Sequence, residues 1–183
     1  MILRSVIFLF FIRKELFLII QRLKKYIKMK SNPELVVLGQ NIQTLVNSNN
    51  FDICELSKNI EYNREAISKL LVGKQNIKLN TLLKICKFFN VSVSSLFDRN
   101  FDNYFSAESN EYIVVDYIKL FFTNLQEIKE TNKIPLSQRF IDPATLSKIK
   151  HGQIKNPTIN TLTSIANDYS TNLKALFSIK KED

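Results

Sequence analysis

The side chains of this sequence that are best suited to chemistry are hydrogen-bonding groups at the start of one short predicted helix. Arg64 offers a planar fork of donors, Glu65 offers acceptor oxygens, and Ser68 can both donate and accept. Apolar residues of the same segment, Ile67 and Leu70 among them, recur at helical spacing and predict its buried face. The polar groups are therefore expected on the opposite face, where they can recognise a polar partner.

Catalytic and metal-binding chemistry is not expected. Cys54 and Cys86 form no CxxC pair and His151 is the one histidine of the chain, whereas a zinc site needs about four nitrogen or sulfur ligands at short spacings. Both cysteines fall at apolar helical positions and are predicted to be buried, reduced thiols, and His151 is predicted to be a surface residue. No Gly-rich phosphate loop and no recognisable nucleophile motif is present, so we expect neither an enzyme nor a cofactor.

Composition favours a mostly helical protein with one domain or two small ones. The 183 residues are 45% hydrophobic, enough to bury a core, and include only 3 Gly and 4 Pro, too few for the regular turns of an all-β fold. The formal net charge is +9, but residues 1–28 carry seven Lys and Arg against Glu15 and so hold +6 of it. The remainder is only mildly basic, so net charge alone does not predict nucleic-acid binding.

Residues 1–28 form a hydrophobic and basic N-terminal segment. Its apolar runs, Val6 to Ile12 and Leu16 to Ile20, are separated by charged residues, and neither approaches the roughly 20 residues that a membrane-spanning helix needs. Two interpretations stay open: an upstream extension that is not part of the working protein, or an amphipathic helix on a membrane surface or in a partner's groove. Asn32 as an N-cap followed by Pro33 predicts that the globular part begins there.

Two halves of the chain follow one plan. The first contains about five short helices, with Asn63 predicted to cap the third, Gly73 to end it, and Ser92 to cap a last turn. The segment RNFDNYFSAESNE between the halves is rich in turn-forming residues and is interpreted as a linker. The predicted divisions after the N-terminal segment are a first domain at 32–98, the linker at 99–111, a second domain at 112–178 and a tail at 179–183.

The second half repeats the plan with one departure. Its first helix is expected to hold Ile113 and Phe121 on one apolar face, and Asp142 with Pro143 predicts the start of its third helix. The stretch between these two helices is about four residues shorter than in the first half. The second helix is therefore expected to cover only Leu136 to Phe140.

A pattern of apolar and polar positions runs without a gap from Leu38 to Phe97. Its most telling parts are Leu38 to Ile42, Asn63 to Leu70, Gly73 to Asn76 and Thr81 to Lys87. This pattern resembles the Cro/C1-type, or XRE, helix-turn-helix family, and the second half resembles it less closely through Leu146 to Gly152 and Asn156 to Leu162. The resemblance implies an all-α fold with two small five-helix lambda-repressor-like helix-turn-helix bundles in tandem, preceded by the hydrophobic and basic segment.

The resemblance also implies which residues of the first half touch DNA. The third helix of this motif enters the major groove, where an arginine can fork onto guanine O6 and N7 and a glutamate can accept from cytosine N4. The base-reading candidates are Arg64, Glu65, Ser68 and Lys69. The phosphate-binding candidates are Asn63, Lys74, Gln75, Asn76 and Lys78. Ile53 stands where many members of the family carry a glutamine that clamps the DNA backbone, so one such contact is absent.

The matching positions of the second half are weaker candidates. Pro143 and Ala144 fall where the first half has Arg64 and Glu65, and their side chains cannot hydrogen-bond to base edges. Polar side chains that follow can still bind phosphate. These weaker candidates are Ser147, Lys148, Lys150 and Lys155.

The resemblance implies a cytoplasmic, nucleoid-associated transcriptional regulator of bacterial type, such as a repressor, that binds double-stranded DNA in a sequence-specific manner. We expect it to act as a homodimer on an inverted repeat, and the two halves of one chain acting as a pseudo-dimer are an alternative geometry. Two further alternatives stay open. One is an antitoxin-like protein whose second half binds a protein partner, and the other is a regulator tethered to a membrane by residues 1–28.

Overall fold

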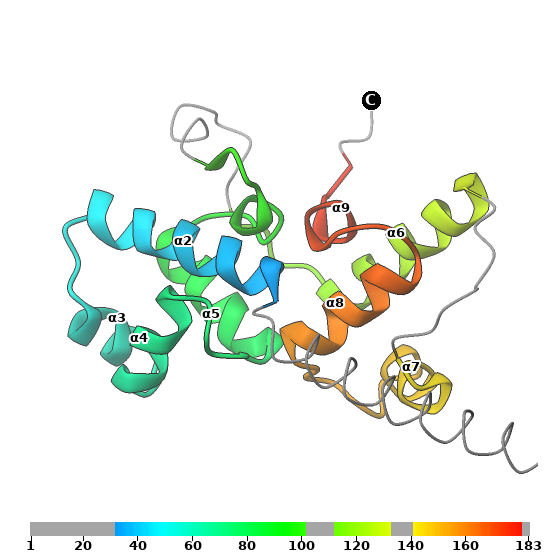
Figure 1. Cartoon of the computed structure of the whole chain (residues 1–183), viewed down its shortest axis with the longest axis horizontal. Coiled ribbons are helices and arrows are strands. Elements are labelled where there is room, and N and C mark those ends of the chain that lie inside the picture. Colours follow the sequence, from blue (N-terminus) through cyan, green and yellow to red (C-terminus); the bar gives the residue numbers. More distant parts are fainter. Residues whose placement is uncertain (1–31, 102–111, 133–140, 181–183) are drawn as a thin grey trace, which may run out of the picture. The chain divides into compact units, whose positions relative to one another are not determined.

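The computed structural model describes residues 32–101, 112–132 and 141–180 (Figure 1). Within these ranges the chain forms eight α-helices and one 3-10 turn, without a β-strand. The predicted all-α class is therefore confirmed for the described part of the chain. The N-terminal segment, most of the predicted linker and the expected helix at Leu136 to Phe140 lie outside the described residues.

The first two helices begin where local capping dictates. In α2 (Pro33–Ser48), Oδ1 of Asn32 accepts a hydrogen bond from the Glu34 amide at 3.0 Å, and Pro33 takes a position that needs no amide partner. The predicted cap is thus confirmed. α3 (Ile53–Asn59) begins with a capping box in which Asp52 and Glu55 each bond the other's backbone amide.

Two further helices and one turn complete the first half. They are α4 (Arg64–Leu71), α5 (Leu79–Phe89) and η1 (Ser95–Phe97). Gly73 follows α4 with φ +70°, as its predicted role in ending that helix requires. The hydroxyl of Ser92 accepts a bond from the Ser95 amide at 3.1 Å, so the predicted cap is confirmed, although the turn it caps is a 3-10 turn.

The second half contains four described helices in a matching order. They are α6 (Tyr117–Asn132), α7 (Pro143–Lys150), α8 (Ile159–Asp168) and α9 (Leu173–Phe177). Asp142 caps α7 by accepting from the Thr145 amide at 3.2 Å, and Pro143 is its first residue, as predicted. Gly152 follows α7 with φ +72°, the counterpart of Gly73 after α4.

One sequence prediction about α6 is wrong. Ile113 was expected on its apolar face, but it precedes the helix and is 50% exposed. The helix starts later because Oδ1 of Asp116 accepts bonds from the Ile118 amide at 3.1 Å and the Lys119 amide at 3.0 Å. The apolar spacing extended past this cap without a break, so spacing alone placed the start too early.

A buried asparagine ties the first helix of each half to the end of that half. Nδ2 of Asn41 donates to the carbonyl oxygen of Leu96 at 3.0 Å, and Nδ2 of Asn124 donates to that of Leu176 at 3.0 Å. Both asparagines are buried, where an amide without a partner would cost free energy. The same polar clamp therefore fixes the last turn in both halves.

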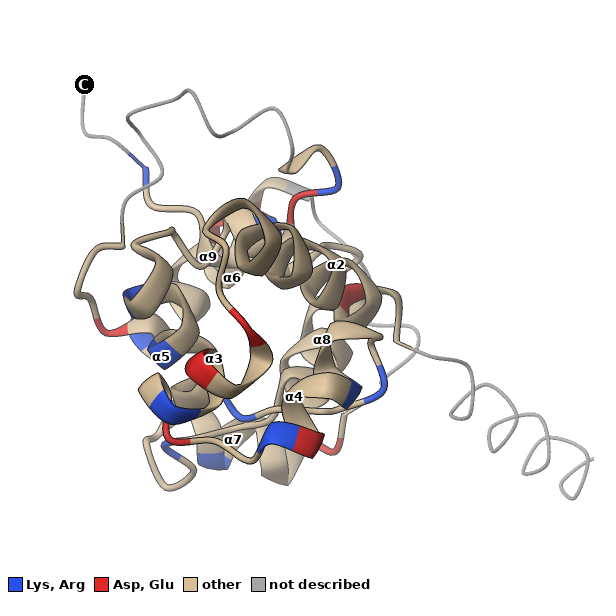
Figure 2. Cartoon of the chain, turned by 90° about the vertical axis from the view of Figure 1, so that its left-hand side faces the viewer, with Lys and Arg blue, Asp and Glu red and all other residues tan. Residues whose placement is uncertain are grey.

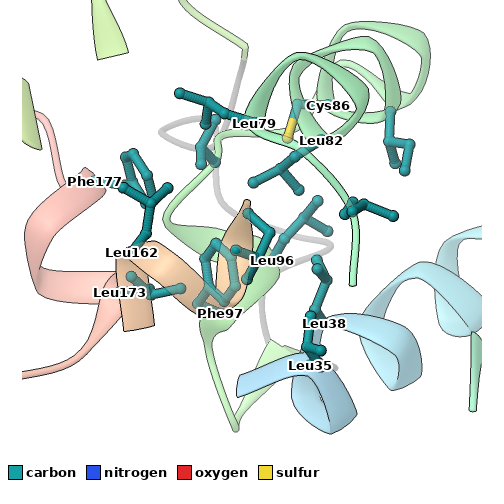
Figure 3. Close-up of a cluster of buried hydrophobic side chains, with 14 of the residues drawn as sticks. Leu35, Leu38, Leu79, Leu82, Cys86, Leu96, Phe97, Leu162, Leu173 and Phe177 are labelled. Atoms are coloured by element: carbon teal, nitrogen blue, oxygen red, sulfur yellow. The ribbon is translucent and has the colours of Figure 1, made fainter. Parts of the chain in front are cut away.

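The two halves share one hydrophobic core. Leu79 and Phe97 from the first half face Leu162 and Phe177 from the second in the buried cluster of Figure 3. The rings of Phe97 and Phe177 stack with centroids 6.1 Å apart and planes 19° apart. The described residues from Asn32 onward accordingly belong to a single compact unit.

Candidate nucleic-acid interface

α3 and α4 are joined by a tight turn that fixes the direction of α4. The Ser57 hydroxyl donates to the carbonyl oxygen of Tyr62 at 2.7 Å, and Glu61 within the turn has φ +51°. Lys84 of α5 bonds the carboxylate of Glu61 at 2.7 Å, and this partner lowers the pKa of Glu61. Two short helices with a fixed turn, packed in one bundle, form a helix-turn-helix.

α4 presents one polar face and buries the other. Oδ1 of Asn63 accepts from the Ala66 amide at 3.0 Å, which confirms the predicted cap. Ile67 and Leu70 are completely buried, so the helix is anchored by its apolar side. All four base-reading candidates lie on the exposed side of the helix: Arg64, Glu65, Ser68 and Lys69.

The exposed side of α4 carries its own weak polar pairs. Nζ of Lys69 lies 2.6 Å from Oε1 of Glu65, and this hydrogen bond and charge lower the pKa of the Glu65 carboxyl. The Ser68 hydroxyl donates to the carbonyl oxygen of Arg64 at 3.2 Å. Exposed pairs of this kind contribute little to stability, so a polar partner can displace them at small cost.

The predicted phosphate-binding residues after α4 divide into two groups. Lys74 and Lys78 are exposed, as phosphate contacts require. Asn76 is half-buried, and its Oδ1 accepts a bond from the amide of Asn160 in the second half at 3.0 Å. Gln75 is also half-buried. The lysines therefore face solvent, whereas the asparagine holds the two halves together.

α7 presents the corresponding face of the second half. The weaker candidates on this helix and in the loop after it are all exposed: Ser147, Lys148, Lys150 and Lys155. Pro143 and Ala144 are exposed at its start. His151 is exposed as predicted, with Nδ1 2.8 Å from the Ser147 carbonyl oxygen.

The loops that follow α4 and α7 pair with each other. Lys78 and Thr158 form an isolated antiparallel bridge, in which the Leu79 amide donates to the Pro157 carbonyl and the Ile159 amide donates to the carbonyl of residue 77, each at 2.9 Å. The loop after α4 and the loop after α7 are thus joined by one short bridge. Both helices lie along the lower edge of the molecule in Figure 1, α4 toward one end and α7 toward the other.

Positive charge is concentrated in the segments that contain these two helices and loops. Residues 64–78 carry four Lys and Arg against one Glu, and residues 143–158 carry three Lys and no Asp or Glu, which gives each a net charge of +3. Residues 32–180 as a whole hold 17 Lys and Arg against 14 Asp and Glu, so the remainder has a net charge of −3. Figure 2 shows Lys and Arg positions on α4 and α7 at the lower side of the view. A polyanion would therefore be attracted to this side.

The cysteines take no part in this surface. Cys86 is fully buried, and burial raises the pKa of its thiol well above the usual range. Cys54 is only half-buried, since it lies at the start of the short α3, so the prediction of a buried thiol is wrong for this residue. Among the described residues, no group of three or more His, Cys, Asp and Glu is placed to hold a metal ion.

Comparison with known proteins agrees with the helix-turn-helix geometry. Residues 41–102 match the family model of the Cro/C1-type HTH DNA-binding domain. The match includes α3, α4 and α5, and therefore the whole exposed face of α4. No curated protein and no solved structure matches the chain significantly. Of the helices in the described ranges, none is long and apolar enough to cross a membrane.

The pairing of the two halves is the part of this surface that sequence reasoning missed. It depends on Asn76 and Asn80 in one half and on Asn156 and Asn160 in the other, which are far apart along the chain. A signal was present, because both loops place asparagines four positions apart at the entry to the following helix. The sequence predicts a repeat, but a predicted repeat does not indicate that the two halves bond to each other.

Proposed function

We propose that this chain is a sequence-specific regulator of transcription that binds double-stranded DNA through α4. The observation that carries the proposal is the exposed row on α4 formed by Arg64, Glu65, Ser68 and Lys69, on a helix whose opposite face is buried in a matched Cro/C1-type domain. An exposed helix of this kind fits the major groove, where its first residues meet base edges. Such a regulator would act at the nucleoid.

The charge distribution supports a DNA backbone as the partner of the surrounding surface. Lys74 and Lys78 extend from the loop after α4, and each is exposed. Contacts of this kind position a protein on the duplex without reading its sequence. Reading would then rest on α4, and affinity on the lysines beside it.

We assign the second half as a degenerate copy of the same domain. The support is the shared order of helices, the side-chain caps before α4 and α7, the glycines with positive φ after them, and the paired clamps from Asn41 and Asn124. A protein partner for the second half stays a prediction. The homodimer on an inverted repeat that the resemblance implies competes with a second geometry, in which the two halves of one chain act together on the DNA.

The test compares specific with non-specific binding of the full chain. Fluorescence anisotropy would follow binding to the duplex upstream of its own gene and to a shuffled duplex of the same composition, over a range of salt concentrations. We expect the R64A/E65A variant to lose about tenfold or more of its preference for the specific duplex, since each good base contact contributes about 1–3 kcal/mol of discrimination. Binding to the shuffled duplex should change much less.

The matched control is K129A/E130A on α6, which removes one exposed charge of each sign and likewise leaves the net charge unchanged. Its preference should equal that of the wild type. If R64A/E65A retains the wild-type preference, α4 does not read the sequence. If the wild type prefers neither duplex, the regulator proposal fails for that site, and the antitoxin-like alternative replaces it.

A further inference from the structure

The two halves bond as the two copies of a symmetric dimer do. The amide of Asn80 donates to Oδ1 of Asn156 at 2.9 Å, and the amide of Asn160 donates to Oδ1 of Asn76 at 3.0 Å. The two bonds are thus equivalent when the halves are exchanged, as the contacts of a two-fold interface are. Two further contacts join corresponding residues of the halves. They are the antiparallel bridge between Lys78 and Thr158 and the stack of Phe97 on Phe177.

Part of this exchange completes a helix. Lys78 is the N-cap residue of α5 and gives no side-chain hydrogen bond to the first turn. Asn156 of the second half supplies that bond instead, to the amide of Asn80. An N-cap bond of this kind contributes about 1 kcal/mol to a helix. The first half therefore depends on the second for a bond that a self-sufficient domain would make itself.

We infer that a single chain is the complete DNA-binding unit, in which α4 reads bases while α7 and the loop after it bind the phosphates of the adjoining stretch of the same duplex. This inference rests on the proposed function of α4. In this arrangement, two unequal halves of one chain take the place of the two identical domains of a homodimer. The DNA site would accordingly be asymmetric. In one stretch α4 would recognise the bases, and in the neighbouring stretch α7 would bind only the phosphates.

α4 and α7 lie on one side of the molecule. Both helices follow the lower edge in Figure 1, and both lie at the lower side of the view in Figure 2. Residues 64–78 and 143–158 each add a net charge of +3 to that side. A duplex bound to α4 would therefore meet a second positive surface on the same chain.

The exposed side chains of α7 are better suited to binding phosphates than to recognising bases. Pro143 and Ala144 have no side-chain donor or acceptor for a base edge. Lys148 has Ala144 four residues before it, whereas Lys69 of α4 has Glu65 in that place and bonds it. Ammonium groups without an acidic neighbour on the helix are suited to phosphate, which they bind as point charges.

The surface through which a second copy would pair in this way is already covered. Oδ1 of Asn76 and of Asn156 each bond the other half, and Phe97 and Phe177 are buried against each other. A second chain would have to break these contacts to make the same ones. The contacts within one chain carry no entropy cost of association, so they prevail over those between chains.

The first test is stoichiometry. Light scattering coupled to size-exclusion chromatography would weigh the full chain alone and bound to a duplex that it prefers, at protein concentrations well above the dissociation constant. We expect one chain per duplex. Two chains per duplex would overturn the inference while leaving the proposed function intact, whereas a failure to bind any duplex would overturn the proposed function instead.

The second test distinguishes phosphate binding by α7 from base recognition by α4. The K148A/K150A/K155A variant should weaken binding to specific and shuffled duplexes by the same factor, and should reduce the salt slope by about 0.9 for each phosphate that the variant no longer neutralises. Its preference for the specific duplex should be unchanged. The control K87A/K119A/K129A removes three exposed lysines on α5 and α6 and should leave both affinities close to wild type.

Two results would overturn the role of α7. One is an unchanged salt slope in K148A/K150A/K155A, which would mean that these lysines touch no phosphate. The other is loss of preference in a variant whose thermal unfolding equals that of the wild type, which would mean that α7 reads bases.

Discussion

α4 and α7 occupy matching places in the two halves, each after a side-chain cap and before a glycine with positive φ. What differs is the exposed face. α4 begins with Arg64 and Glu65, and α7 begins with Pro143 and Ala144. Caps and buried residues hold a helix in place, whereas exposed side chains determine what it recognises. Two helices can therefore hold corresponding positions in their halves while the chemistry of their exposed faces differs.

The helices that pack against α4 and α7, which are α2 and α6, differ as well. Gly39 lies two residues before the clamp residue Asn41, and a Cβ there would come within 2.4 Å of the Leu70 carbonyl oxygen. The corresponding residue before Asn124 is Phe122. Phe122 is one of the residues that line a hollow of about 710 Å³ between α6 and α7. A glycine thus lets α2 and α4 pack closely, whereas the corresponding place in the second half holds a bulky residue beside a hollow.

The largest expected effect in this comparison comes from Gly39→Ala. The added methyl would press on the backbone of α4, and overpacking of this severity costs about 3 kcal/mol. Phe122→Leu, which changes the corresponding residue beside the hollow, should cost less than about 1.5 kcal/mol. Urea unfolding of both variants measures the difference. Equal costs would show that α2 and α4 can separate as easily as α6 and α7.

A smaller effect is expected at the two glycines that follow α4 and α7. Both have positive φ, so alanine at either should cost about 1–2 kcal/mol from backbone strain. At Gly73 a Cβ would also lie 2.8 Å from Cα of Val36, whereas at Gly152 it would meet nothing within 4 Å. Thermal or urea unfolding should therefore show Gly73→Ala to be the more damaging by about 1 kcal/mol or more. The reverse order would contradict the packing of α4 against α2.

The reciprocal asparagines allow a finer comparison. Asn156→Ala removes the side-chain bond that the first turn of α5 receives from the second half, and should cost about 1–2 kcal/mol. Asn76→Ala should cost less, about 0.5–1 kcal/mol, because α8 keeps its own cap from Thr158. Equilibrium unfolding of the two variants checks this order. If Asn76→Ala were the more damaging, Asn156 would not be the cap of α5.

The smallest effect concerns charge on α4. The hydrogen bond and charge of Lys69 lower the pKa of Glu65, so Lys69→Met should raise the pKa of that carboxyl toward its ordinary value. In the wild type the stabilising contribution of the pair is present above the pKa of the unfolded chain and is lost as pH falls through the lowered value. Carboxyl chemical shifts followed by NMR against pH report it. No movement of the Glu65 titration would mean that the two side chains do not pair in solution.

Much of the fold was open to prediction because its determinants are local. Asn32, Asn63 and Asp142 cap helices within a few residues of themselves, and Gly73 ends α4 at the next turn of the chain. A cap needs only a suitable side chain and the amide groups that follow it. The exposed face of α4 was predictable for the same reason, since the apolar residues of that helix define its buried side.

The relation between the halves was not predictable in this way. The bond from Asn80 to Asn156 joins residues 76 positions apart, and nothing in either loop specifies the other as its partner. The start of α6 was misplaced because apolar spacing continued through Asp116, the residue that caps the helix. Periodicity describes which face is apolar, but caps and long-range contacts decide where a helix begins and what it packs against.

The most direct test of the central claim is selection of bound sequences from a random duplex library by the full chain. We expect an asymmetric consensus with one stretch strongly specified by α4, and cleavage footprinting on that consensus should show an adjoining stretch that is protected without being specified. The R64A/E65A variant should yield no such consensus, although it should still bind duplexes without preference. An inverted repeat with two equally specified halves, or recovery of no preferred sequence at all, would contradict the account.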